Sequence, residues 1–162
     1  MKKILLLSIL LPLLLACGEE TVRNTVHQAE AISDHERCHQ CGMMITKYPG
    51  PKGQVFLKRQ EHSVKFCSTR DMFSFALQVE NQRQITGLFV HDVANTPWGK
   101  PQDDAFIDAT KAWYVYGSGK QAVMGPAVAS FSSKQSASQF AQEFGGAVIG
   151  YEQIDINFLE GE

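Results

Sequence analysis

A short pattern that occurs twice constrains the fold of this chain more than any other sequence feature. Phe66-Cys67-Ser68 is followed by Phe75 nine positions on, and Phe131-Ser132-Ser133 is followed by Phe140 at the same spacing. The two copies are offset by 65 residues. A unit of that length is too small to bury one face of a sheet alone, so we expect the two copies to pack together as one pseudo-symmetric body.

The first copy predicts the element order β-β-α-β. Two short alternating runs, Gln54–Lys58 and His62–Phe66, are separated by three polar residues and are typical of a hairpin. A hydroxyl side chain can then cap a helix over Thr69–Val79, whose apolar residues recur at helical spacing. The mostly apolar run Gln84–Asp92 predicts a third strand.

The second copy repeats this order. Ala112–Gly117 and Ala127–Phe131 predict two strands, and Lys134–Phe144 predicts a helix with an apolar face. Gly145-Gly146 ends that helix as a left-handed cap would, and Ala147–Tyr151 is the last expected strand. The chain is therefore predicted to be an α+β protein made of two similar β-β-α-β lobes.

The N-terminus predicts a lipoprotein signal. Lys2 and Lys3 precede Ile4–Leu15, a run of twelve almost purely apolar residues that is well short of the ~20 residues a membrane-spanning helix needs. The run ends in Leu14-Leu15-Ala16-Cys17, which is typical of a bacterial lipobox with Cys17 as the lipidated residue. A plain secretory signal is the alternative.

These features predict a protein tethered outside the cytoplasm. Gly18 follows the lipidated cysteine, which favours the outer over the inner membrane in a diderm cell, and we expect the chain to face the periplasm. The polar stretch Glu19–Arg37 is typical of a flexible tether. Loss of Lys2 and Lys3 changes the formal net charge from −2 to −4, which disfavours nucleic acid as a partner.

The chain is expected to divide into five segments: a signal peptide at 1–16, a lipidated cysteine and tether at 17–37, a first lobe at 38–92, a connecting loop at 93–104 and a second lobe at 105–162.

Three cysteines remain once Cys17 is lipidated, and an odd number does not suit a purely structural disulfide framework. Cys38 and Cys41 form a Cys-x-x-Cys motif, whereas Cys67 stands alone as either a metal ligand or a small buried residue. A thioredoxin-like redox pair would open a helix after a strand, yet no strand pattern precedes Cys38. A c-type haem would need histidine directly after Cys41, where Gly42 stands.

Structural zinc and Cu(I) are the remaining interpretations. Zinc would use the three cysteines and one histidine, the candidates being His35, His39, His62 and His91. Cu(I) prefers thiolate and thioether ligands. Met43 lies two residues past Cys41, and Met124 precedes the backbone breakers Gly125-Pro126. The sequence therefore favours a soft-metal site built from two separate loops.

Several motifs resemble the NosL family in their order along the chain. They are the lipobox at Cys17, Cys38-x-x-Cys41-Gly42-Met43, Phe66-Cys67-Ser68-Thr69-Arg70-Asp71-Met72-Phe73, Phe106-Ile107-Asp108-Ala109 with Ala112-Trp113-Tyr114-Val115, and Met124-Gly125. NosL proteins are accessory lipoproteins encoded with nitrous oxide reductase. The resemblance runs from about Cys38 to the last expected strand.

This resemblance implies a fold related to part of the organomercurial lyases. It also implies Cu(I) as the bound metal and delivery of copper for assembly of the tetranuclear copper-sulfide (CuZ) centre of nitrous oxide reductase. The reductase, other copper-assembly proteins and the membrane are the implied partners, and a homodimer is left open.

A copper carrier must bind Cu(I) and later release it, and we rank the expected ligands by how well they suit such a site. Cys41 and Met124 come first, followed by Cys38 and Met43. His39 is a further nitrogen donor, and Cys67 comes last. We expect no catalysis. The alternative functions are those of a thiol-disulfide oxidoreductase and of a thiol-based enzyme that cleaves organometals.

Overall fold

The computed structural model describes residues 26–160, which form two antiparallel sheets. The first sheet has the order β2-β1-β3-β4, with β1 at Gly53–Leu57, β2 at Val64–Phe66, β3 at Ile85–His91 and β4 at Phe106–Asp108. The second sheet has the order β6-β5-β7, with β5 at Trp113–Gln121, β6 at Pro126–Phe131 and β7 at Ala147–Gly150.

Within residues 26–160, four α-helices accompany the sheets: α1 at Thr69–Ala76, α2 at Val79–Gln82, α3 at Lys134–Phe144 and α4 at Ile156–Glu160. Short 3-10 helices lie at Ile45–Lys47, Asp103–Ala105, Ala109–Lys111 and Tyr151–Gln153.

The two β-β-α-β units expected from the repeated pattern are both present. In each unit the first strand lies between the other two, which gives β2-β1-β3 and β6-β5-β7. The helices begin in the same way, because the Ser68 hydroxyl accepts the N–H of Asp71 and the Ser133 hydroxyl accepts the N–H of Ser136. These two serine caps are offset by the same 65 residues as the sequence pattern, and each satisfies a backbone donor that would otherwise be unpaired.

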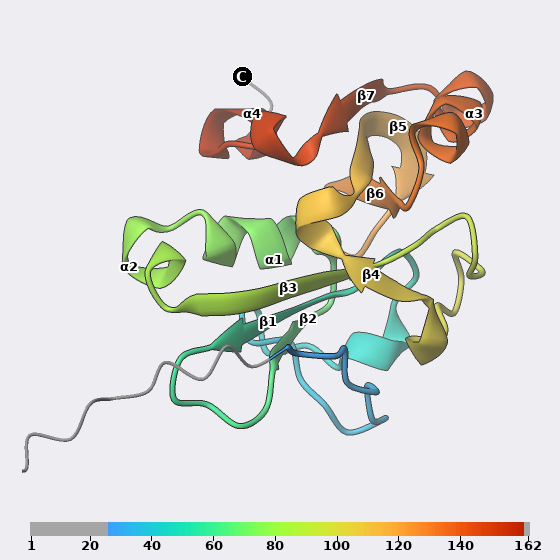
Figure 1. Ribbon diagram of the computed structural model, residues 1–162. Helices are drawn as coiled ribbons and strands as arrows, with labels where there is room; N and C mark the ends of the chain where they lie inside the picture. Colours follow the sequence, from blue (N-terminus) through green and yellow to red (C-terminus); the bar gives the residue numbers. More distant parts are fainter. Residues whose placement is uncertain (1–25, 161–162) are drawn as a thin grey trace, which may run out of the picture.

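One core joins the two units. Helix α1 lies between the first sheet and the elements of the second unit (Figure 1), and it contacts β1, β6 and α4. Phe73 of α1 packs edge to face against the fully buried Tyr114 of β5, with ring centroids 5.3 Å apart. The Tyr114 hydroxyl donates a hydrogen bond to the Ala109 carbonyl, so its polar atom is satisfied inside the core. The α+β class is confirmed.

Helix α1 and strands β5 and β4 differ most from the expected elements. Helix α1 ends at Ala76 rather than Val79, because the Asn81 side chain donates to the Phe75 carbonyl and caps the end of the helix. Strand β5 continues past Gly117, which adopts φ +75° within a stretch where the strand register shifts. Strand β4 pairs with β3 in the first sheet, although its residues fall within the expected second lobe.

The described start of the chain, which lies in the stretch expected to be a tether, makes specific contacts with strand β1. His27 stacks on Phe56 with ring centroids 4.2 Å apart, and Glu30 exchanges two hydrogen bonds with the side chain of Gln54. His27 and Glu30 therefore attach this segment to the first sheet. The expected signal peptide, the lipidation site Cys17 and residues 18–25 lie outside the described residues. Among residues 26–160 no helix is long and apolar enough to cross a membrane.

Candidate metal centre

The Cys-x-x-Cys motif forms a tight turn closed by backbone hydrogen bonds. The Cys38 N–H donates to the Met43 carbonyl and the Gly42 N–H donates to the Cys38 carbonyl, both at 2.8 Å. Gly42 has φ +74°, a conformation that side-chain-bearing residues rarely adopt, which explains why glycine follows Cys41. The turn leaves Cys38 buried and Cys41 half-buried.

A backbone contact brings this turn to the end of strand β2. The N–H of His39 donates to the Lys65 carbonyl at 2.9 Å. Two residues later Cys67 follows β2, and Ser68 begins helix α1. The strand end thus places a third sulfur beside the turn, although Cys67 is 26 positions from Cys41.

Cys38, Cys41, Cys67 and Asp71 form one cluster, in which the four ligand atoms all lie within 4.8 Å of one another. The Cys41 and Cys67 sulfurs are 3.4 Å apart. The Cys67 thiol donates to the Asp71 Oδ2 at 2.9 Å. Three soft sulfur donors and one carboxylate therefore converge, with Cys41 and Asp71 on the more accessible side.

The three thiols differ in acidity because they share hydrogen bonds. The neighbouring polar groups of Cys67, side chain first, and of Cys41 lower the pKa of Cys38 well below its usual value. The same contact to Cys38, together with burial and the neighbouring Asp71, raises the pKa of Cys67. Burial raises the pKa of Cys41.

A buried lysine lies beneath the cluster. Lys52 is 3% exposed, and its ammonium donates to the carbonyls of Tyr48, Pro49 and Cys67 at 2.7, 3.2 and 3.0 Å. Burial lowers the pKa of Lys52 to about 8, although the nearby acidic groups of Cys67, Asp71 and Cys38 act in the opposite direction. This cation offsets part of the negative charge that a thiolate cluster places in the protein interior.

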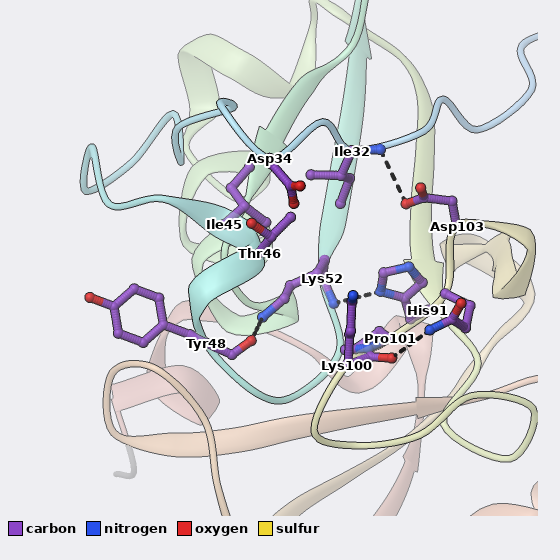
Figure 2. A pocket seen from close by; sticks show the side chains of 11 residues that line it. Ile32, Asp34, Ile45, Thr46, Tyr48, Lys52, His91, Lys100, Pro101 and Asp103 are labelled. Carbon is purple, nitrogen blue, oxygen red and sulfur yellow. Dashed lines mark hydrogen bonds between the residues drawn. The ribbon is translucent and has the colours of Figure 1, made fainter.

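Lys52 also borders a cavity of about 220 Å³ (Figure 2). The Lys52 N–H donates to Nδ1 of His91, which is 1% exposed, and burial lowers the pKa of His91 to about 3. The imidazole is therefore neutral with its proton on Nε2, which lacks a hydrogen-bond partner among the described residues. None of the three clustered cysteines lines this cavity.

Of the six expected metal ligands, three belong to the cluster and three do not. Cys38, Cys41 and Cys67 come together, so the cysteine ranked last lies inside the cluster. Met43 is half-buried and packs against the main hydrophobic core. His39 is exposed, and its ring meets the edges of Phe66 and Phe75.

Met124 lies on the loop between β5 and β6, and its side chain is 50% exposed. Arg70 of α1 donates to the Met124 carbonyl at 3.2 Å and to the Leu159 carbonyl at 2.8 Å. Arg70 directly precedes Asp71 of the cluster. The loop that carries Met124 is thus fastened to the helix that carries part of the metal centre.

The sequence does not by itself identify Asp71 or Lys52 as residues of this site. Asp71 could have been found from its position four residues after Cys67 in the first turn of a capped helix, where side chains at that spacing meet. No comparable signal exists for Lys52, because its three acceptors are backbone carbonyls.

The structure also bears on two alternatives to a copper site, a thioredoxin-like redox pair and a zinc site with a histidine ligand. The Cys38–Cys41 pair lies in a turn rather than at the start of a helix, so the thioredoxin-like arrangement is not formed. The fourth group of the cluster is Asp71 and not one of the four candidate histidines. His62 contacts Glu30, and His91 contacts the Lys52 backbone.

The fold and the site define a class of small α+β proteins with a thiol-rich, partly exposed cluster that could hold a metal, between a cysteine turn and the start of a helix. A model of the NosL family matches residues 29–159. The chain belongs to the NosL family.

Characterised relatives match over most of their length. A copper-binding lipoprotein NosL from Stutzerimonas stutzeri is 42% identical over 156 residues, covering 96% of this chain and 81% of the relative. A copper-binding lipoprotein NosL from Achromobacter cycloclastes is 33% identical over 155 residues, covering 94% of this chain and 79% of the relative. The crystal structure of the copper chaperone NosL from Shewanella denitrificans matches with a TM-score of 0.78 and 44% identity, covering 80% of this chain and 96% of that one.

Proposed function

We propose that this chain binds Cu(I) and delivers it for assembly of the CuZ centre of nitrous oxide reductase. The observation that carries the proposal is the cluster of Cys38, Cys41 and Cys67, whose sulfurs lie within 4.8 Å of one another. The relatives named copper-binding lipoprotein and copper chaperone support the same metal. Delivery to the reductase comes from the family resemblance.

The donor chemistry favours Cu(I) in this cluster. Thiolates are soft ligands. Among the common cellular metals they bind Cu(I) and zinc best. The lowered pKa of Cys38 favours its thiolate form, which is the form that binds the metal. Cys41 and Cys67 supply further sulfurs when their protons leave, so two or three thiolates hold the metal.

Release requires an accessible ligand that can exchange. Cys41 is half-buried, whereas Cys38 and Cys67 are 3% and 0% exposed, so an acceptor thiol approaches copper from the Cys41 side. Met124 is the second exchangeable donor in this proposal, because a neutral thioether leaves without separating charge. The bond from Arg70 to its carbonyl holds this loop on α1.

Zinc is the second candidate metal, and Asp71 is the observation that favours it. Three cysteines and a carboxylate make a four-ligand set of the kind that zinc accepts. A structural zinc site would hold its metal in a closed tetrahedron and would not pass it on.

The proposed setting is the periplasmic face of a membrane, with Cys17 lipidated and the outer membrane favoured. The proposed partners are nitrous oxide reductase and other copper-assembly proteins. A second copy of the chain, sharing one metal in a homodimer, is a further proposed partner. The chain acts as a carrier, without a catalytic step of its own.

Metal binding is tested by an anaerobic Cu(I) titration of the soluble chain starting at Gly18, in competition with a chromophoric chelator. We expect one copper per chain and a loss of affinity of at least about 10-fold in Cys41→Ser. Ser132→Ala is the matched control, because Ser132 occupies the position of Cys67 in the second repeat. Wild-type binding no tighter than that of Cys41→Ser would contradict the proposal.

Delivery is tested in a denitrifying cell that lacks the gene for this chain. We expect wild type and Ser132→Ala to restore the optical spectrum of CuZ in the purified reductase, and Cys41→Ser to leave the reductase without it. Full CuZ content in the cells that lack the chain would contradict the delivery role.

A further inference from the structure

Two sulfurs of the cluster are already close to the geometry of a disulfide. The Sγ atoms of Cys41 and Cys67 are 3.4 Å apart, so they need to approach by about 1.4 Å to reach the bonded S–S distance of ~2.05 Å. The two segments are already joined by the hydrogen bond from His39 to the Lys65 carbonyl. This backbone contact therefore keeps the two cysteine-bearing segments next to each other while the sulfurs approach.

Accessibility distinguishes this pair from the Cys38–Cys41 pair that the sequence motif suggests. Cys41 is half-buried, whereas Cys38 is 3% and Cys67 0% exposed. A disulfide reagent from solvent therefore meets Cys41 first. The sulfur that Cys41 contacts at 3.4 Å is that of Cys67.

We infer that Cys41 and Cys67 are the site of a reversible disulfide that closes the copper centre, an inference that rests on the proposed function. Cys41, the most accessible of the three thiols, gives up its proton, and its sulfur attacks a protein or small-molecule disulfide RSSR, releasing one RS⁻ and forming a mixed disulfide. Cys67 then attacks the Cys41 sulfur and releases the second RS⁻. Both cysteine protons end on the two leaving groups, so the pair is oxidised by two electrons and RSSR is reduced to two RSH.

This bond and bound copper exclude each other. The disulfide removes two of the three clustered sulfurs as thiolate ligands and leaves Cys38 alone. A Cu(I) ion held by Cys41 and Cys67 occupies the sulfur lone pairs that would attack RSSR. The chain therefore loads copper only after a dithiol has reduced the pair, and a loaded chain resists oxidation.

The test maps the disulfide in the full-length chain, purified from membranes in detergent and treated with oxidised glutathione. After acid quenching and alkylation, trypsin cuts at Arg37, Lys47, Lys65 and Arg70. Cys38 and Cys41 then share peptide 38–47, Cys67 lies on peptide 66–70, and Cys17 lies on neither. We expect a disulfide that joins peptides 38–47 and 66–70.

Two variants identify the partner of Cys67. We expect Cys38→Ser to keep the cross-link and Cys41→Ser to lose it. The inference is overturned by a disulfide confined to peptide 38–47, by a glutathione adduct that persists on Cys41, or by a cross-link of equal yield in Cys41→Ser.

Measurement of Cu(I) binding by the oxidised and the reduced chain distinguishes failure of this inference from failure of the proposed function. We expect the oxidised chain to bind Cu(I) at least about 100-fold more weakly than the reduced chain, with full recovery after reduction by a dithiol. Equal binding by the oxidised and reduced chains overturns the inference and leaves the proposed function intact. A reduced chain that binds no Cu(I) overturns both, even if the cross-link forms.

Discussion

The Cys67 thiol donates a hydrogen bond of 2.9 Å to the carboxylate of Asp71, which lies four residues further along in the first turn of α1. This contact places a hard oxygen donor beside three soft sulfur donors. The metal that the cluster prefers therefore depends on whether the carboxylate takes part in binding.

Replacement of Asp71 by asparagine separates the two metals. The amide keeps the shape and an acceptor for the Cys67 thiol but loses the negative charge. We expect Asp71→Asn to lower Zn(II) affinity about 10-fold or more, because zinc accepts a carboxylate ligand, and to change Cu(I) affinity by less than about 3-fold. Competition titrations with each metal measure both values. A larger loss for Cu(I) than for Zn(II) would contradict a sulfur-only copper site.

The bond from Arg70 to the Met124 carbonyl predicts a linked effect on copper. Arg70→Gln should free the Met124 loop and weaken Cu(I) binding about 3- to 10-fold, as loss of a supporting contact around a metal site does. In a chain that already carries Met124→Ala, Arg70→Gln should add little, because the ligand it holds is gone. Equal effects of Arg70→Gln in both backgrounds would show that Arg70 acts without Met124.

Acid should weaken the attachment of the N-terminal segment to the first lobe. Partial burial tends to raise the pKa of Glu30, but hydrogen bonds from Ser63 and His62 and the charge of Lys65 outweigh it and lower the pKa from 4.5 to about 2. The carboxylate therefore stabilises the fold above pH 4.5, and this contribution disappears as the pH falls to about 2.

We expect Glu30→Gln to lower the free energy of unfolding by about 1–2 kcal/mol at pH 7, with the difference from wild type vanishing near pH 2. Urea denaturation at several pH values measures it. Glu143→Gln is the control, because Glu143 is exposed on α3. A difference between Glu30→Gln and wild type that stays constant with pH would contradict this assignment.

Close packing between β1 and α1 predicts a stability effect at Gly53. A Cβ atom there would lie 2.6 to 2.9 Å from three side-chain atoms of the buried Met72. We expect Gly53→Ala to lower the free energy of unfolding by about 1–3 kcal/mol, because overpacking displaces the helix. Gly99→Ala is the matched control, since a Cβ at Gly99 meets nothing within 4 Å. Equal stability of the two variants, measured by urea denaturation, would contradict the packing argument.

Much of the fold could be predicted because local signals repeat. The caps at Ser68 and Ser133 and the double glycine after α3 fix where the helices begin and where α3 ends. Val79 shows the limit of periodicity, because it sits at helical spacing from the core residues of α1 and yet is 68% exposed. Gly117 suggested a strand end, but it accommodates an irregularity inside β5.

The candidate site could be predicted only in part. The Cys38–Cys41 turn is local, and its glycine and cysteines indicate a metal or thiol centre directly. The place of Cys67 depends on a backbone contact between the turn and β2, for which a sequence carries no local signal. Asp71 joins the site through the same packing, so the composition of the cluster appears only in three dimensions.

X-ray absorption spectroscopy of the soluble chain loaded anaerobically with one Cu(I) tests the central claim most directly. We predict a copper(I) edge and a first shell of two or three sulfur atoms, with one sulfur fewer in Cys41→Ser and an unchanged shell in Ser132→Ala. The same measurement on Met124→Ala shows whether a thioether contributes one of these sulfurs. A first shell that contains nitrogen or oxygen, or one that keeps all its sulfurs in Cys41→Ser, would contradict copper binding by the cysteine cluster.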